Sequence, residues 1–204
     1  MPTFLLIRHG ENDFLKQGLH PGQLPGIHLN ERGREQAQAL VDTLKSAPIR
    51  AIHSSPLERA VETAEPLARS LGLTIQLRPA LLDVNVGEWQ GQRNTDLHKL
   101  PLWKELKKQP SRVRFPGGES FLELQQRLVG EFELLLHLHR PKDMLAVVFH
   151  LDPIMLVLAH FLGLPLDNFR RFSISPGSVS ILAVDRSGGK LLGLNLIPPF
   201  TLPG

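Results

Sequence analysis

Short apolar runs alternate with amphipathic segments along most of this chain. Runs at residues 3–7, 49–53, 74–77 and 144–149 are rich in Ile, Val, Leu and Phe, which is typical of buried strands. Apolar positions between them recur at helical spacing. This alternation predicts an α/β fold, a three-layer α/β/α sandwich with a mostly parallel central sheet.

Capping signals mark the predicted starts of three helices. Asn30 precedes an amphipathic segment. Ser55 with Glu58 forms a capping box with proline at the first helical position, and Ser120 with Glu123 forms another. We therefore expect helices to follow each of these positions.

Other segments have weaker patterns. Residues 12–29 hold many glycines and prolines and are predicted to be a loop. One helix, interrupted by Pro101, is expected over residues 96–108. Residues 178–184 and 191–196 predict a closing hairpin.

The length and composition favour one folded domain over residues 1–204. Hydrophobic residues make up 42% and charged residues 21%, as in ordinary globular proteins. The formal net charge of +3 comes from scattered Lys and Arg, which suits small anions and not nucleic acid. The chain has no cysteine, which excludes thiolate nucleophiles, disulfides and Cys-ligated metals.

Two apolar segments are candidates for a targeting or a membrane segment, and neither has the features of one. Residues 3–7 lack the basic region and cleavage site of a signal peptide, so we expect a cytoplasmic protein. The apolar region 144–166 approaches the length of a membrane span, but polar residues, including His150 and Asp152, interrupt it. We therefore expect no membrane association.

Polar side chains follow the predicted strands where parallel sheets place active sites. Arg8 and His9 follow the first strand, Arg59 comes soon after the second, and His150 follows the late one. The guanidinium of arginine binds two phosphate oxygens, and a neutral imidazole can attack phosphorus. The pattern therefore indicates phosphoryl chemistry.

Two segments in order make the chain similar to a known family. Leu6-Ile7-Arg8-His9-Gly10-Glu11 and Ser54-Ser55-Pro56-Leu57-Glu58-Arg59-Ala60 resemble motifs of the histidine phosphatase superfamily, also called the phosphoglycerate mutase-like family. The resemblance covers nearly the whole chain. It implies the phosphoglycerate mutase-like fold, phosphorylation of His9, and phosphate binding by Arg8 and Arg59.

Two further segments extend the resemblance. Residues 82–91 are similar to the segment where the family has a catalytic glutamate, and here that position is Asp83. Glu88 is the alternative acid. Val147-Val148-Phe149-His150 matches the strand that ends in the second histidine, which implies catalytic and phosphate-binding roles for His150.

The chain departs from the family at three positions. Leu15 stands where many relatives have a phosphate-binding asparagine. Leu151 and Asp152 follow the second histidine, where glycine is usual. Asp152 is expected to raise the basicity of His150 if the two lie within hydrogen-bond distance.

Each assignment has a structural alternative. Arg59 alone would be an exposed helix residue paired with Glu62, and His150 would be a core histidine. Asp83 would stabilise a turn. Phe14 and Trp89 fit either a pocket wall or the core. The remaining histidines lack a metal-ligand pattern, so we expect no metal and no cofactor.

Three functions remain open. A phosphomonoesterase, a hydrolase of the histidine acid phosphatase type, would act on a small phosphorylated substrate. The short insert and the turn at 117–120 resemble smaller phosphatase members, including α-ribazole-phosphate phosphatase-like proteins. The alternatives are a bisphosphoglycerate-dependent phosphoglycerate mutase and a non-catalytic phospholigand-binding protein. An edge strand could also pair two subunits into a homodimer.

The mutase alternative depends on basic residues that could bind a second anionic group. They are Lys99, Lys104, Lys107, Lys108, Arg112 and Arg114.

Overall fold

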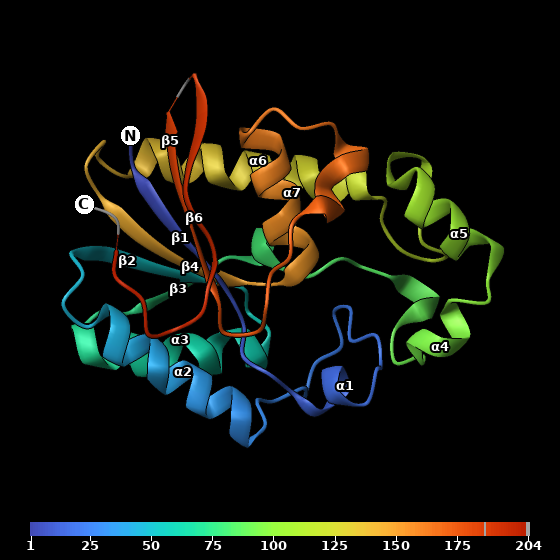
Figure 1. The fold of residues 1–204 in the computed structure, drawn as a ribbon, viewed down its shortest axis with the longest axis horizontal. Coiled ribbons are helices and arrows are strands. Elements are labelled where there is room, and N and C mark those ends of the chain that lie inside the picture. The colour runs from blue at the N-terminus through green and yellow to red at the C-terminus, as the bar shows by residue number, and fades with distance from the viewer. Residues whose placement is uncertain (186, 203–204) are drawn as a thin grey trace.

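A mixed sheet runs through the middle of the molecule (Figure 1). The computed structural model describes residues 1–185 and 187–202, and in these residues six strands form one sheet in the order β3-β2-β4-β1-β5-β6. The first four of that order are parallel, whereas β5 is antiparallel to β1 and β6 to β5. The strands are β1 (Thr3–Arg8), β2 (Ile49–Ser54), β3 (Ile75–Leu77), β4 (Met144–Phe149), β5 (Val179–Asp185) and β6 (Gly188–Leu196).

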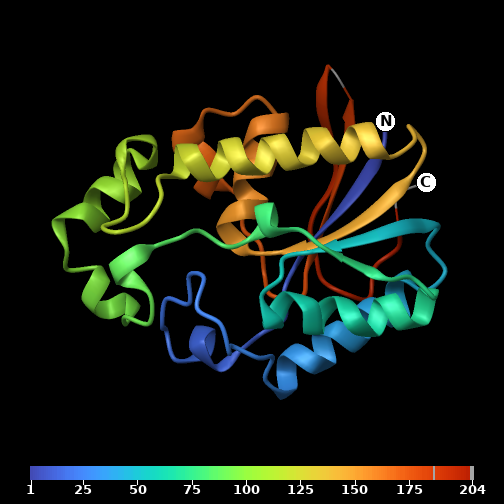
Figure 2. The ribbon, with the colours of Figure 1, turned by 180° about the vertical axis from the view of Figure 1, so that it is seen from behind.

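Helices cover both faces of this sheet, which confirms the predicted α/β/α sandwich. Figure 1 and the reverse view in Figure 2 show α2 and α3 on one face and α6 and α7 on the other. The helices are α1 (Asp13–Lys16), α2 (Glu31–Leu44), α3 (Glu58–Leu71), α4 (Asn94–Leu97), α5 (Pro101–Lys108), α6 (Phe121–Leu138) and α7 (Leu151–Phe161).

Alternation along the central strand explains why the sheet needs two helical layers. Phe4 and Leu6 of β1 pack into one hydrophobic cluster, while Leu5 and Ile7 pack into the other. Successive strand side chains point to opposite faces, so a strand that is apolar at every position must be covered twice. The core is therefore divided between the two faces.

The strand register brings polar residues together at the carboxyl ends of the parallel strands. Arg8 pairs with Phe149 and Ser54 with Val148, so β1, β2 and β4 end at the same level. The ladder continues one step further, since the backbone N–H of His9 donates to Phe149 O at 3.0 Å and that of Ser55 to Val148 O at 2.9 Å. His9, Ser55 and His150 therefore emerge side by side.

Two of the three predicted helix caps are confirmed. The side chain of Asn30 accepts a hydrogen bond from Gly33 N at the start of α2, and Ser120 with Glu123 forms a full capping box at α6. The predicted box of Ser55 with Glu58 is wrong. Residue 57 is still extended, α3 begins at Glu58, and the hydroxyl of Ser55 turns toward the site instead.

The segment before α6 also differs from its prediction. In place of one helix over 96–108, α4 ends at Leu97 and α5 begins at Pro101, because proline suits the first position of a helix and not its interior. The expected loop at 12–29 contains the single turn of α1, which the Asn12 side chain caps. Figure 1 shows α4 and α5 beyond the carboxyl ends of the parallel strands.

Candidate active site

A cleft of about 490 Å³ opens at the carboxyl end of the parallel strands, and Arg8, His9 and Asp83 line it. Arg59 and His150 are fully buried directly behind Asp83 and contact it. The structure thus brings together all five of the predicted site residues. The rest of the wall comprises Leu15, Leu19, His20, Pro21, Gly22, Val84, Asn94, His98, Trp103, Leu151, Asp152, Met155, Arg170, Phe172, Ser173 and Ile174.

His9 is held in one orientation and one tautomer. Its Nδ1 lies 2.8 Å from Gly10 O, and because a carbonyl only accepts, Nδ1 carries the hydrogen. Burial, with the nearby Arg59 and Arg8, holds the pKa of His9 well below its ordinary value. The ring is therefore neutral, and the lone pair on Nε2 is free to act as a nucleophile.

Close backbone packing sets the position of His9. A Cβ on Gly10 would meet Gly33 O at 2.7 Å, and one on Gly33 would meet Glu11 O at 2.1 Å. The N–H of Gly10 also donates to Thr63 Oγ1 at 2.9 Å. Glycine at both positions therefore allows the start of α2 to approach the loop that carries the nucleophile.

Arg8 and Arg59 supply buried positive charge. Arg8 donates to Ile174 O at 2.6 Å, and burial lowers its pKa to about 10, so it stays protonated at neutral pH. Arg59 donates to Gly22 O at 2.7 Å and lies 3.4 Å from Asp83 Oδ2. The Nε of each guanidinium lacks a partner in the described residues, which leaves donors available to an anion.

The alternative pairing of Arg59 with Glu62 is wrong. Glu62 instead contacts the His28 side chain at 2.5 Å and accepts from Leu29 N at 2.8 Å. Arg59 points the other way, into the protein, and is 0% exposed. Its position at the start of α3 adds the favourable field of a helix N-terminus to that of its own charge.

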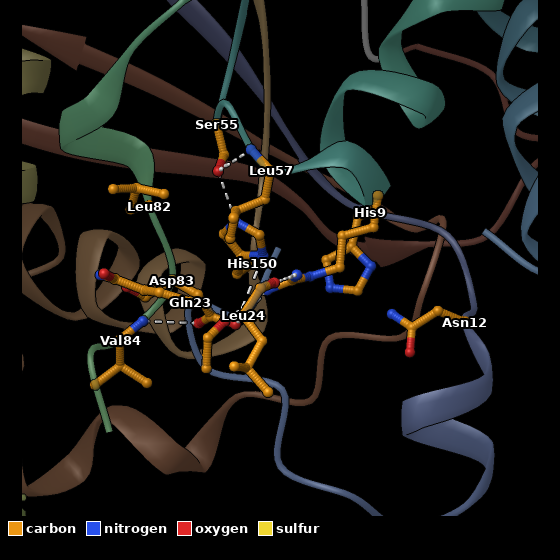
Figure 3. Close-up of polar contacts among 12 residues, drawn as sticks. His9, Asn12, Gln23, Leu24, Ser55, Leu57, Leu82, Asp83, Val84 and His150 are labelled. Carbon is orange, nitrogen blue, oxygen red and sulfur yellow. Dashed lines mark hydrogen bonds and ion pairs between the residues drawn. The ribbon is translucent and has the colours of Figure 1, made fainter. Parts of the chain in front are cut away.

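Asp83 has the environment of a carboxylic acid that exchanges its proton near neutral pH. Burial raises the pKa of Asp83 to about 6, although Arg59 opposes the shift. One carboxylate oxygen accepts from Val84 N at 2.9 Å, and the other lies 3.6 Å from His150 Nδ1 (Figure 3). The aspartate therefore reaches the same site as both histidines despite its short side chain.

His150 is oriented by Ser55, a role that the sequence did not reveal. Nε2 of His150 lies 2.8 Å from Ser55 Oγ, which also accepts from Leu57 N at 3.4 Å (Figure 3). Because Nδ1 faces the carboxylate of Asp83, which accepts hydrogen bonds, the ring hydrogen is favoured on Nδ1, and Nε2 then accepts from the Ser55 hydroxyl. Burial of the ring keeps the pKa of His150 well below its ordinary value, and the positive charge of Arg59 lowers it further.

Three further side chains hold the Asp83 segment in place. Arg127 donates to Ala80 O at 2.7 Å and pairs with Glu119 at 2.8 Å, and Glu119 in turn accepts from Asn85 N. Gln23 donates to Asp83 O at 2.7 Å. No sequence motif pointed to these residues, because each acts across 8 to 60 positions of sequence.

Asn12 lies beside the His9 ring and was not predicted to do so. Its Oδ1 accepts from Leu15 N at 2.9 Å, which directs its amide nitrogen toward the His9 ring (Figure 3). That nitrogen is buried without a partner in the described residues. Asn12 precedes Leu15 by three positions, and Leu15 is the position at which many relatives have a phosphate-binding asparagine.

The structure also decides the remaining alternatives around the site. Asp152 makes no hydrogen bond with His150 in the described residues, and Asp83 is the carboxylate beside that ring. Trp89 packs in the core against Trp103, and neither Trp89 nor Phe14 lines the cleft. Glu88, the alternative acid, is exposed and does not line the cleft.

Neither a metal centre nor a membrane span is found in the part of the chain that the structure describes. No group of three or more His, Asp or Glu side chains there is arranged to hold a metal ion. Within residues 1–185 and 187–202, no helix has both the length and the apolar character that crossing a bilayer requires.

Known proteins share the sequence pattern along nearly the whole chain. A family model described as the histidine phosphatase superfamily (branch 1) matches residues 4–197. Phosphoserine phosphatase 1 of Hydrogenobacter thermophilus is 29% identical over 96% of this chain and 93% of its own. The 2,3-bisphosphoglycerate-dependent phosphoglycerate mutase of Thermoplasma acidophilum is 25% identical over 97% of this chain and 94% of its own.

Solved structures agree with the sequence relatives. The α-ribazole phosphatase from Shigella flexneri superimposes with a TM-score of 0.86 at 26% identity, covering 98% of this chain and 100% of its own. The fold and the family are therefore those that the sequence motifs indicated.

Proposed function

This chain belongs to the histidine phosphatase superfamily, and from that premise we propose that it is a phosphomonoesterase, a hydrolase of the histidine acid phosphatase type. The observation that carries the proposal is the state of His9. Its ring is neutral, its Nδ1 is tied to Gly10 O, and it shares one cleft with Arg8 and Asp83. The substrate is a small phosphomonoester.

In the proposed reaction Nε2 of His9 attacks phosphorus and the bond to the ester oxygen breaks. Arg8, Arg59 and the Nδ1–H of His150 hold the phosphoryl oxygens, whose charge spreads in the transition state. Asp83 gives its proton to the leaving oxygen, and the alcohol departs. Asp83 then takes a proton from water as the water attacks the phosphohistidine, which releases phosphate and restores His9.

The contacts of Asp83 suit this sequence of steps. Its Oδ2 lies 3.4 Å from a guanidinium nitrogen of Arg59 and 3.6 Å from Nδ1 of His150. An oxygen of a bound phosphoryl group could occupy the same position between these two groups. In the proposal phosphoryl oxygens take over both contacts when substrate binds. The carboxyl group, with its raised pKa, is then left to face the ester oxygen.

A phosphoglycerate mutase is the second candidate, supported by the Thermoplasma relative. It would need cations for a second anionic group of the substrate. The six basic residues considered for that role do not line the cleft, and Arg170, which does, has its guanidinium over the rings of Phe121 and Phe169. Among them, Lys99 pairs with Asp96, Arg114 pairs with Glu123, and Lys107 lies over the Trp103 ring. This observation favours hydrolysis.

The test compares wild type with His9→Ala on para-nitrophenyl phosphate and on 3-phosphoglycerate with bisphosphoglycerate primer. A phosphatase releases phosphate in a His9-dependent way and forms an acid-labile, base-stable phosphoprotein intermediate. Isomerised product would favour the mutase. Phosphate binding without turnover or phosphohistidine would make a non-catalytic phospholigand-binding protein the better description.

A further inference from the structure

The cleft contains an acidic side chain that phosphate binding does not require. Asp152 occupies the second position of α7, two residues after His150, and lines the cleft together with Arg8 and His9. In the described residues its carboxylate makes no hydrogen bond and no ion pair. Asp152 therefore adds to the cleft a carboxylate that forms no ion pair within the described residues.

This charge acts on the phosphoryl site. Asp152 raises the pKa of both Asp83 and Arg8, which places its carboxylate within electrostatic range of the reacting groups. It also opposes the attraction that the N-terminus of α7 would have for an anion. An acid at this position stabilises the start of α7, but it also lowers the affinity of the cleft for phosphate alone and is available to a cationic group of the substrate.

Arg8, whose pKa Asp152 raises, forms no ion pair with it in the described residues and donates instead to Ile174 O. The other neighbouring groups do not pair with Asp152 either. Arg170 lines the same cleft, but its guanidinium lies over the rings of Phe121 and Phe169 at 5.4 and 5.3 Å and forms no ion pair with Asp152 among the described residues. His20 also faces the cleft, and burial lowers its pKa, which keeps the ring neutral. Space remains beside the carboxylate for a cation that the substrate brings.

We propose that Asp152 binds an ammonium group of the substrate, so that the preferred substrates are phosphomonoesters of amino alcohols or hydroxy amino acids. The positive nitrogen then lies a few bonds from the ester oxygen, because Asp152 and His9 share one cleft. This inference rests on the proposed phosphatase function. The proposed role of Asp152 is to select the alcohol that leaves.

Two commercially available probes isolate this interaction. O-phosphoserine and 3-phosphoglycerate have the same skeleton and differ in one group, an ammonium against a hydroxyl at carbon 2. The ratio of their kcat/KM values therefore measures the binding of the ammonium alone. A charge pair in a partly hydrated cleft changes such a ratio by about tenfold, so we expect wild type to favour phosphoserine by about that factor.

Asp152→Asn is expected to lower this ratio by about tenfold, while Asp152→Glu, which keeps the charge, retains most of it. Asp42→Asn is the matched control, since Asp42 is exposed on α2 outside the cleft, and its ratio should equal that of wild type. A ratio that does not change in Asp152→Asn would overturn the proposal.

The wild-type measurement decides the question even if Asp152→Asn does not fold. Equal or better turnover of 3-phosphoglycerate by wild type would also overturn the proposal. Failure of the phosphatase function is distinguishable, because para-nitrophenyl phosphate would then not be hydrolysed at all. Turnover of para-nitrophenyl phosphate without a preference for phosphoserine would contradict only the role of Asp152.

Discussion

Nε2 of His150 lies 2.8 Å from Oγ of Ser55, and this contact joins the ends of two strands that are 95 positions apart in sequence. The hydroxyl accepts a hydrogen bond from Leu57 N and donates to Nε2 when the ring hydrogen is on Nδ1, the nitrogen that faces the carboxylate of Asp83. Ser55 thereby determines which ring nitrogen of His150 faces Asp83. A residue that resembles a helix cap thus has its main contact with a site histidine.

Ser55→Ala is expected to lower kcat/KM by about 5- to 10-fold, because a buried hydrogen bond contributes about 1–1.5 kcal/mol. Without the hydroxyl, both tautomers of His150 are populated and only one donates toward the site. Steady-state kinetics with para-nitrophenyl phosphate measure the effect. Ser70→Ala removes an exposed hydroxyl from the end of α3 and is the control. Wild-type kinetics in Ser55→Ala would contradict this role.

Asp83→Asn should slow alkyl phosphates by about 10²–10⁴-fold, the usual contribution of a general acid. A para-nitrophenolate ion leaves without protonation, so hydrolysis of the aryl ester should fall much less. The measurement is the dependence of kcat/KM on the pKa of the leaving alcohol, which should be steeper in the variant. Equal losses on alkyl and aryl substrates would rule out Asp83 as the acid.

The pH profile should place the optimum on the acid side. Asp83 acts as an acid only while protonated, and its pKa is raised to about 6, so kcat/KM for an alkyl phosphate should fall as pH rises through about 6. His9 must be neutral, and its lowered pKa puts the acidic limb well below pH 6.5. Asp83→Asn should remove the limb near 6. If that limb persists in the variant, another group titrates there.

Arg127→Met should loosen the segment that carries Asp83. The side chain donates to Ala80 O and Leu82 O and pairs with Glu119, and hydrogen bonds from a charged group contribute about 1.5–3 kcal/mol. We expect that loss in the free energy of unfolding by urea titration, with a lower kcat for alkyl phosphates.

The control for Arg127 is Arg32→Met, which breaks an exposed pair with Glu35. Surface pairs of this kind contribute less than about 1 kcal/mol, so Arg32→Met should stay close to wild type in both measurements. Comparable effects of the two substitutions would mean that Arg127 does not hold the Asp83 segment.

Gly33→Ala and Gly130→Ala form a matched pair within helices. A Cβ at Gly33 would lie 2.1 Å from Glu11 O, whereas a Cβ at Gly130 meets nothing within 4 Å. We expect Gly33→Ala to destabilise the fold by about 1–3 kcal/mol and to displace His9, with loss of activity. Gly130→Ala should stabilise it by about 0.5–1 kcal/mol. Thermal unfolding and phosphatase assays of both variants would show whether the close approach matters.

Local chemistry explains why much of the fold could be predicted. The runs at 4–7 and 144–149 are apolar at every position, which is typical of a strand buried on both faces. The caps at Asn30 and Ser120 satisfy helix N–H groups within three residues, so their effect is contained in the sequence. Pro101 was placed inside one helix, and the structure shows that it begins a new one.

By itself, the sequence determined the α/β class, the strands of the sheet, the family, and the five residues that the structure gathers behind and along one cleft. The contacts of those residues were decided only by the tertiary structure. Ser55 facing His150, Arg127 holding the Asp83 segment and Asp152 unpaired in the cleft all depend on how distant segments pack. Hydrogen bonds and charges act through space over a few ångströms, and the spacing of residues along the chain does not specify those distances.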